Sequence, residues 1–540
     1  MNDFLKRLSA LALVLSLLLL TGCTKTGDGI SLSVCVGAEP DSLDPIYAEE
    51  PGDQSILCHL YENLMRIAPD ASGQTAVVNG MAKSVDMEEE TIEGGVSVTY
   101  TFRLRSARWS DGQAVKASDF VYAWQRLADP DSNSPYATLL SSVSGFTEAR
   151  ASGDMSLLQV SAKNDSTFVV VLNGRHDWFL KEVCTSPATM PLRQDVVQRL
   201  KTAASDGSWW GDPTALVTNG PYAAAEYGDT LLLVQNSRYY GDQSGPQEIR
   251  FYFAGAPEEA QNLYADKTVD AVWPSAEDDG TWAPMLETHA AVFNCAEGPF
   301  ADVSLRRALS LAVGRNALAE AAGASAKPAE GLVPSGVPES ADGDFRTVGG
   351  PLLDHDFELY EEACAQAKAL LQEAGYDSGA DLGELEYLCM EDEESIAVAD
   401  VLCRQWQEVL EIQITPKALP ERELMTALRN GEYTLAGLRL TASVNDAECF
   451  LSDWVSGSYN NVAAYQSTAY DTLMSVVASA WDGTARMGCL HDAEELLLMD
   501  YVLAPLYDCG TTWAVRDTLT GAIRDPRGWF AFYNVYTRSA

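Results

Sequence analysis

The chain has 540 residues, of which 46% are hydrophobic, and it carries a formal net charge of −42 at pH 7. That length exceeds what one hydrophobic core usually serves, so it predicts two or three globular lobes. The strong negative field repels phosphate backbones and anionic headgroups, which excludes nucleic-acid binding and attachment through a polybasic surface.

The first 23 residues have the pattern of an export signal. Lys6 and Arg7 precede an apolar run over residues 8–20, which is too short to span a bilayer unaided, and the tetrad LTGC ends the run. This tetrad resembles a bacterial lipobox. The resemblance implies a lipoprotein signal peptide over residues 1–22, lipidation of Cys23 by palmitate, and a location on the extracytoplasmic face of the cell membrane. The alternative is an uncleaved signal anchor with Cys23 as an ordinary thiol.

Strand patterns recur along the rest of the chain. Apolar and polar residues alternate over residues 96–104, which predicts a half-buried strand. Ser118 can then cap a helix that ends at residues 129–130. Residues 167–172 and 231–234 are continuous β-branched and apolar runs, as expected of strands buried on both faces.

Helix patterns follow in the second half. Apolar residues share one face of a predicted helix over residues 302–313, with Arg306 on the opposite side. A second helix is predicted over residues 358–374, with Gly375 as its C′ residue. Residues 323–351 are dense in glycine, proline, alanine and serine and predict a long surface excursion within a lobe. The interleaving of strands and helices predicts an α/β fold.

The cysteines and histidines give no metal motif. Ten cysteines follow Cys23, an even number that permits disulfides in an exported chain. Cys364, Cys389, Cys403 and Cys449 lie in apolar surroundings, so buried free thiols are the other interpretation. No histidine lies in an HExxH motif, and no cysteine pair has the spacing of a zinc site. We therefore expect neither a metal nor a cofactor.

Several motifs lie in order along most of the chain. The most specific are WSDG at 109–112, ASDFVYAW at 117–124, DP at 129–130 and SPY at 134–136. The others are AEPDSLDP at 38–45, TNGPY at 218–222, GPFADV at 298–303, RRAL at 306–309, a leucine-rich helix at 363–376, FL at 450–451 and APLY at 504–507. Together they resemble the extracytoplasmic solute-binding proteins of ABC importers, oligopeptide and dipeptide-binding family (solute-binding protein family 5).

The resemblance implies a periplasmic-binding-protein-like bilobed α/β clamp, type II, of the large oligopeptide-binding subclass. Its first lobe is discontinuous and comprises residues 23–64, 190–290 and 508–540. An extra α/β domain spans residues 65–189, and the second lobe spans residues 291–507. Solute lies in the interlobe cleft and closure buries it. Peptides are held mainly through their backbone, as an added strand.

The implied function is capture of peptides or related small solutes and their delivery to the permease subunits of an ABC importer, by a monomer held at the membrane through lipid. We find no GxSxG, SxxK, HExxH or Walker A motif, which favours a binding protein over an enzyme. Three alternatives stay open. They are a peptide-sensing lipoprotein without transport, a receptor for a non-peptide solute such as a nickel chelate or an oligosaccharide, and an exported hydrolase with paired carboxylates.

Candidate ligand contacts carry over by position in the family pattern. Tyr136 and Trp454 are candidates to cover the ligand, although aromatic side chains equally often fill a core. The backbone around Asn219 and Gly220 can offer polar groups near the hinge. Glu39 lies at a strand end that faces the cleft in relatives, and its alternative is a simple turn residue.

One departure from the family concerns the ligand's amino end. Peptide-binding members place an aspartate shortly before the Phe-Leu pair, where it accepts the α-ammonium of the ligand, but Ser443 stands at that register. A hydrogen bond to a charged partner contributes about 1.5–3 kcal/mol, so free-amine peptides should bind poorly unless another group substitutes. Asn445 and Asp446 follow closely, and Asp446 is the candidate substitute. Arg439 is a candidate partner for a ligand carboxylate or forms a surface salt bridge.

Overall fold

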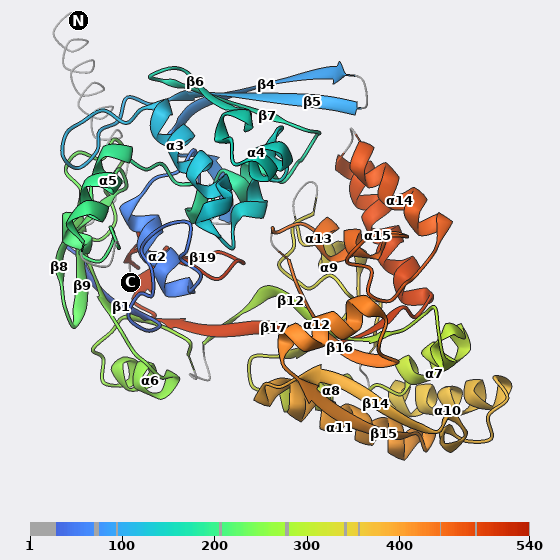
Figure 1. Cartoon of the computed structure of the whole chain (residues 1–540). Coiled ribbons are helices and arrows are strands. Elements are labelled where there is room, and N and C mark those ends of the chain that lie inside the picture. The colour runs from blue at the N-terminus through green and yellow to red at the C-terminus, as the bar shows by residue number, and fades with distance from the viewer. Residues whose placement is uncertain are drawn as a thin grey trace, which may run out of the picture.

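The computed structural model describes residues 29–69, 75–92, 95–204, 208–275, 280–339, 343–354, 357–442, 444–480 and 483–538. Cys23 and Ser443 lie outside these ranges. Two lobes are joined by two long, paired antiparallel strands, β12 (Thr281–Phe293) and β17 (Leu503–Val515), which run between them (Figure 1). Within the described ranges, no helix has both the length and the apolar character that a membrane span requires.

An eleven-stranded sheet extends through both lobes. Its order is β15-β14-β16-β12-β17-β11-β1-β10-β9-β8, with β13 (Lys327–Pro328) paired to β17. In the first lobe, β1 (Ser31–Val36) lies parallel to and between β10 (Glu248–Tyr252) and β11 (Ala271–Trp273). The hairpin of β8 (Tyr222–Tyr227) and β9 (Thr230–Gln235) forms the edge. The first lobe is therefore assembled from segments far apart in the chain.

The C-terminal segment completes the first lobe against helix α2 (Pro51–Leu60). The amide of Phe530 donates to Ser55 Oγ at 2.8 Å, and the amide of Phe532 donates to His59 Nε2 at 2.9 Å. The short strand pairs of this segment are β18 (Leu519–Thr520) with β21 (Tyr536–Thr537) and β19 (Ile523–Arg524) with β20 (Phe530–Ala531). The first lobe also carries α5 (Gln194–Ala203) and α6 (Pro257–Ala265).

A separate antiparallel sheet of four strands lies above the first lobe in Figure 1. Its order is β4 (Ala82–Ile92), β5 (Gly95–Leu104), β7 (Thr167–Leu172) and β6 (Val160–Asn164). Strand β5 confirms the alternating pattern. Strand β7 confirms the predicted strand, but the expectation of burial on both faces is wrong, because only alternate residues enter the core. The hairpin of β2 (Met65–Pro69) and β3 (Thr75–Asn79) precedes this sheet.

Helix α3 (Ala117–Ala128) packs beneath this sheet, and α4 (Phe146–Ser152) follows it. The predicted cap at Ser118 is wrong, since the N-cap residue is Lys116. The amide of Lys116 donates to the carboxylate of Asp119 at 2.9 Å, which satisfies the first turn two residues earlier than expected. The helix ends at Asp129, as predicted.

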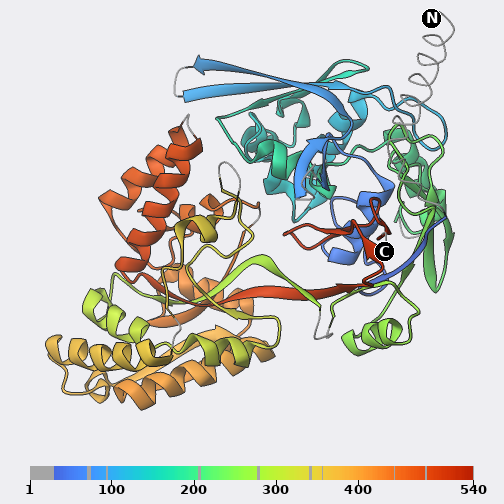
Figure 2. The same cartoon turned by 180° about the vertical axis from the view of Figure 1, so that it is seen from behind.

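The helices of the second lobe cover both faces of its part of the sheet (Figures 1 and 2). The strands are β14 (Glu384–Met390), β15 (Gln413–Leu419) and β16 (Leu435–Thr441). One face carries α7 (Val303–Leu311), α8 (Arg315–Ala322), α10 (Phe357–Glu373) and α11 (Glu393–Leu410). The other carries α9 (Phe345–Gly349), α12 (Glu421–Asn430), α13 (Glu448–Leu451), α14 (Thr468–Ser479) and α15 (Gly483–Met499).

Two expectations about the second lobe need correction. Arg306 is buried, because its guanidinium donates to backbone carbonyls that include those of Phe300 and Asp500. The stretch at 323–351 is not a surface excursion, since five of its apolar residues are buried; they are Ala329, Leu332, Val333, Val337 and Phe345. The helix predicted over residues 358–374 is confirmed, and Gly375 follows it with φ of 93°.

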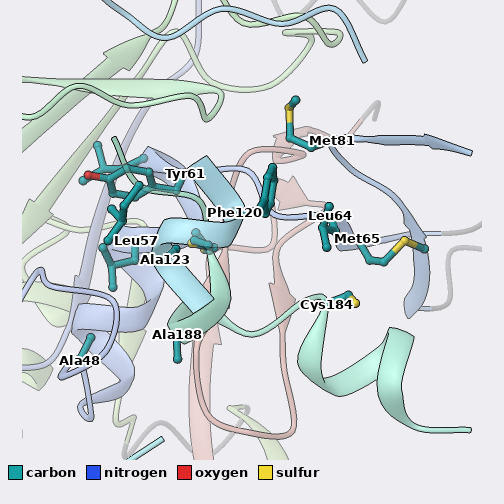
Figure 3. Packing of buried hydrophobic residues seen from close by; sticks show 14 of the residues in the cluster. Ala48, Leu57, Tyr61, Leu64, Met65, Met81, Phe120, Ala123, Cys184 and Ala188 are labelled. Carbon is teal, nitrogen blue, oxygen red and sulfur yellow. The ribbon is translucent and has the colours of Figure 1, made fainter. Parts of the chain in front are cut away.

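The first lobe and the four-stranded sheet share one hydrophobic core. Figure 3 shows residues of this cluster from α2, from α3 and from the segment around Cys184, packed together. None of the ten cysteines of the described ranges forms a disulfide; Cys389 and Cys403 are buried, and Cys364 and Cys449 are partly exposed. Apolar packing therefore supplies the stability of these lobes without covalent links.

Candidate functional site

A pocket of about 290 Å³ lies between the two lobes, beside the hinge strands. The first lobe and its extra sheet domain contribute Ala48, Glu49, Gln54, Pro135, Tyr136, Thr138, Leu139, Ser186, Pro187, Ala188, Pro526, Arg527 and Trp529. The hinge and second lobe contribute Met285, Leu286, Glu287, Thr441 and Ala442. A solute in this pocket would contact both lobes at once.

Tyr136 forms part of the pocket wall, where the SPY turn holds it. Its amide donates to Ser134 Oγ at 3.1 Å, which fixes the backbone of the turn. Its hydroxyl accepts a hydrogen bond from Gln54 Nε2 at 2.8 Å and donates to the Ala48 carbonyl at 3.0 Å. Burial raises the pKa of Tyr136 to about 12, so it is a neutral donor and acceptor at the pocket surface.

Three charged side chains of both signs line the pocket, namely Glu49, Glu287 and Arg527. Burial would raise the pKa of Glu287, but hydrogen bonds with His289 and Thr441 lower it to about 2, so this carboxylate is ionised. Arg527 faces it from the C-terminal segment and is already paired with Asp525 at 2.7 Å. The pocket therefore offers a solute both signs of charge, each partly satisfied within the protein.

Asn219 and Gly220 contact the chain at the C-terminal end of α2. The side chain of Asn219 accepts from the amide of Glu62 and donates to its carbonyl, both at 3.0 Å. A Cβ atom on Gly220 would lie 2.6 Å from the carbonyl carbon of Leu60, so only glycine fits against the end of α2. These two residues are placed to hold α2 and do not line the pocket.

Glu39 and Trp454 also lie away from the pocket. Glu39 follows β1 and accepts a hydrogen bond from the hydroxyl of Tyr227 at 2.8 Å. Trp454 is 1% exposed in the second-lobe core, and its indole donates to the carbonyl of Phe450 at 3.0 Å. The core-packing interpretation therefore describes Trp454.

Arg439 lies on β16, two residues before the pocket residue Thr441. Its Nε atom is 3.2 Å from His289 Nε2 and 3.6 Å from Glu287, and its terminal nitrogen is 3.8 Å from Asp392. The side chain is about one-third exposed, at 35%. It takes part in ion pairs within the second lobe, as the salt-bridge interpretation expects.

Asp446 is buried and paired. Arg486 binds both of its carboxylate oxygens, at 2.8 and 3.1 Å, and one oxygen also accepts from the amide of Glu448 at 2.9 Å. The negative charge is therefore balanced inside the lobe. An ammonium group would have to replace Arg486 in order to bind Asp446 in this arrangement.

The loop that carries Asp446 reaches the opposite lobe. Val444 packs into the hydrophobic core of the first lobe, whereas the side chain of Asn445 donates to the carbonyl of Gly336 in its own lobe at 3.2 Å. Burial raises the pKa of Glu182 in the extra domain, while Arg527 and the backbone amide of Asn445 act to lower it. Val444 and Asn445 thus form a direct contact between the lobes.

The sequence pattern missed most of the pocket. Gln54, Glu287, Thr441 and Arg527 come from four distant segments, and no local motif marks them. It also missed that Glu287 and His289 meet Cys509, which is more than 200 residues away. The only local signal was the Glu-Thr-His run, whose first and third side chains share one face of a strand.

Comparison with known proteins finds relatives that are extracellular or periplasmic binding proteins. The family model "Bacterial extracellular solute-binding proteins, family 5 Middle" matches residues 77–462. The chain is 28% identical over 488 residues to the probable deoxycholate-binding periplasmic protein YgiS of Escherichia coli K12, covering 87% of this chain and 86% of that protein. It is 26% identical over 527 residues to the periplasmic oligopeptide-binding protein OppA of the same organism, covering 93% and 91%.

Solved structures share the fold. The unliganded open form of the periplasmic murein tripeptide-binding protein MppA aligns with a TM-score of 0.79 at 23% identity, covering 94% of this chain and 98% of that one. The Haemophilus influenzae OppA complex with the peptide RPPGFSPFR aligns with a TM-score of 0.66 at 25% identity, covering 95% and 99%. The predicted fold class, a bilobed type II α/β clamp, is confirmed.

Proposed function

The chain belongs to family 5 of the bacterial extracellular solute-binding proteins, and from this premise we propose that it is a lipid-anchored receptor that delivers a captured solute to an ABC importer. The observation that carries the proposal is the interlobe pocket, whose walls come from both lobes on either side of the hinge strands. The receptor itself breaks no bond in the solute, and ATP is hydrolysed by another chain.

Capture works through a shift between open and closed forms. A solute that contacts both walls stabilises the closed form by the difference between its affinities for the two states. The higher TM-score to an unliganded open form supports an open conformation here. Strands β12 and β17 are suited to act as the hinge, because register irregularities between Pro284 and Thr288 and between His289 and Ala290 interrupt their pairing.

For the solute we propose a peptide or a related molecule that does not depend on a free amino end. Relatives bear the names of oligopeptide-binding, murein peptide-binding and probable deoxycholate-binding proteins. The pairing of Asp446 with Arg486 supports the expectation that a ligand ammonium finds no free carboxylate there. An apolar carboxylate such as a bile acid is the second candidate. It is favoured by the lack of a free carboxylate for a ligand ammonium and by the 28% identity to the probable deoxycholate-binding protein.

The experiment is native purification followed by mass spectrometry of the trapped solute, and titration of that solute by tryptophan fluorescence. Tyr136→Ala should weaken binding by roughly tenfold, since it removes a wall aromatic and two hydrogen bonds of the pocket. Tyr459→Ala is the matched control, because Tyr459 is 77% exposed and lies outside the pocket. Equal affinities in the two variants would contradict this site, and turnover of the solute would contradict the receptor role.

A further inference from the structure

Six side chains form a grid on one face of the sheet at the hinge. In the β16–β12 pair, Arg439 lies opposite His289 and Thr441 lies opposite Glu287. On the other side of β12, Tyr507 lies opposite His289. Cys509 follows Tyr507 by two residues and so faces the same side. Strand alternation therefore collects a carboxylate, an imidazole and a thiol at one place.

Three of these side chains have the spacing of metal ligands. One ligand atom each from Glu287, His289 and Cys509 can be chosen so that all lie within 4.8 Å of one another. Within this group, His289 Nε2 lies 3.1 Å from a Glu287 oxygen. His289 is buried and the other two are partly buried, so these ligands are not spread over a solvated surface.

A further contact orients the imidazole toward this group. The hydroxyl of Tyr507 donates to Glu394 at 2.7 Å and lies 2.5 Å from His289 Nδ1. Since Glu394 takes the hydroxyl proton, the tyrosine oxygen can accept from Nδ1–H of His289. This tautomer frees the Nε2 lone pair for a metal ion, at the expense of the hydrogen bond from Nε2 to Glu287. The lone pair of Nε2 then points toward Glu287 and Cys509. Metal-binding histidines are commonly fixed by such a contact on their second nitrogen.

A cation already lies at this position. The Nε atom of Arg439 donates to His289 Nε2 at 3.2 Å and lies 3.6 Å from Glu287. Arg439 is one-third exposed, and Asp392 lies 3.8 Å from its terminal nitrogen, so the side chain has another partner toward which it can turn. The guanidinium thus balances a cluster of donors that a metal ion can also neutralise.

We propose that Glu287, His289 and Cys509 form a binding site for a borderline divalent transition metal ion such as Zn²⁺, from which Arg439 withdraws. A thiolate, an imidazole and a carboxylate are a donor set suited to such an ion, and three protein ligands leave a fourth position free. Binding forms the metal–sulfur bond and releases the thiol proton of Cys509 to solvent. Because Glu287 also lines the interlobe pocket, the fourth position lies near the solute.

The test uses the full-length protein, stripped with a chelator and titrated with Co²⁺ as a spectroscopic probe. We expect a thiolate-to-cobalt charge-transfer band that Zn²⁺ abolishes by competition. Cys509→Ser should remove the band, whereas Cys489→Ser, a partly exposed cysteine on α15, should leave it. Cobalt binding without the band, or a band that survives in Cys509→Ser, would overturn the proposal.

Two further variants test the roles of the neighbours. Arg439→Gln should tighten Zn²⁺ binding by roughly tenfold, because it removes a competing positive charge from a partly exposed position. Tyr507→Phe should weaken it by roughly tenfold or more, since it removes the contact that orients His289. Unchanged or weaker binding by a folded Arg439→Gln protein would overturn the proposal. Solute binding to the metal-free protein is measured separately, so failure of the metal site leaves the receptor proposal standing.

Discussion

The hydrogen bonds of His59 require a neutral imidazole ring. It is fully buried, with Nδ1 2.6 Å from the carbonyl of Ser55, and Nε2 accepts from the amide of Phe532 at 2.9 Å. Its ring stacks on that of Phe532, with centroids 5.8 Å apart. Burial lowers the pKa of His59 from 6.5 to about 4, and the hydrogen bond to Ser55 only partly opposes this. A proton on Nε2 would remove the acceptor for the C-terminal segment.

We predict that His59 weakens the fold in mild acid. The unfolded chain binds a proton below pH 6.5 while folded His59 binds one only near pH 4, so stability present above pH 6.5 is lost as the pH falls toward 4. The loss amounts to roughly 3 kcal/mol. Denaturant unfolding of wild type and His59→Gln at pH 8, 6 and 4 measures it. The difference in the free energy of unfolding between wild type and His59→Gln should change with pH. A difference that is the same at all three pH values would contradict the prediction.

For Arg306, the sequence pattern predicts the side of the helix but not the burial of the side chain. Helix periodicity correctly predicts that Arg306 lies on a different side of the helix from the apolar stripe. Its burial depends on carbonyls at Asp500 and Tyr501, almost 200 residues away. Tyr136 belongs to a motif and could be proposed as a cleft residue, whereas Glu287 and Arg527 reach the same pocket only through the pairing of distant segments.

At the scale of elements, the loop before α13 and helix α15 are joined by a buried charge pair. Asp446 and Arg486 have side chains that are 7% and 6% exposed, and Arg486 also binds Glu448 at 2.6 Å. Charges taken out of water are tolerated when each is paired and hydrogen-bonded. The pair fixes the loop that carries Val444 and Asn445 to the other lobe.

We predict that this pair is strongly coupled. Arg486→Met leaves the Asp446 carboxylate buried without its cation and should lower the free energy of unfolding by about 3–5 kcal/mol. The double variant Asp446→Asn with Arg486→Met should recover most of that loss. Lys417→Met is the control, since Lys417 and Glu386 form an exposed pair whose loss should cost less than about 1 kcal/mol. Additive effects in a urea-unfolding cycle would contradict the coupling.

Elements with a complete local signal were predictable from the sequence. Strand β5 and helix α10 follow from period and end signals alone. The segment at 323–351 was not, because its glycines and prolines predict a loop while Leu332 and Phe345 are buried by neighbours elsewhere in the chain. The one-sided burial of β7 likewise depends on which elements cover the sheet, and no window of sequence contains them.

At the scale of the whole molecule, the two lobes, the strongly negative net charge and the proposed N-terminal tether suit one task. A closing clamp needs no covalent chemistry, and its strongly negative charge keeps it away from anionic lipid. A lipid on Cys23 would hold it beside its importer and raise its effective concentration there. The proposed function thus depends on capture of the solute and on closeness to the importer. Both are properties of the assembled molecule and of no single residue.

We predict that Cys23→Ser separates anchoring from capture. The variant should leave the membrane fraction and appear in the soluble extracytoplasmic fraction, because it lacks the sulfur that carries the lipid. Its affinity for the trapped solute should stay unchanged, since the pocket is built from residue 48 onward. Cys489→Ser controls for loss of a cysteine. Retention of Cys23→Ser in the membrane fraction, by immunoblot, would contradict the proposed lipid anchor.

The hydrogen bond between Phe532 and His59 also affects the order in which the lobes can fold during synthesis. These partners are 473 positions apart, so helix α2 and the strand beside it wait for their last neighbours until almost the entire polypeptide has been made. The second lobe lies between them in the chain, and the residues of its two cores end at Tyr507, before the last neighbours of α2 are made. The part made first is therefore finished last, and a nascent chain of this design stays incompletely folded until translation is nearly over.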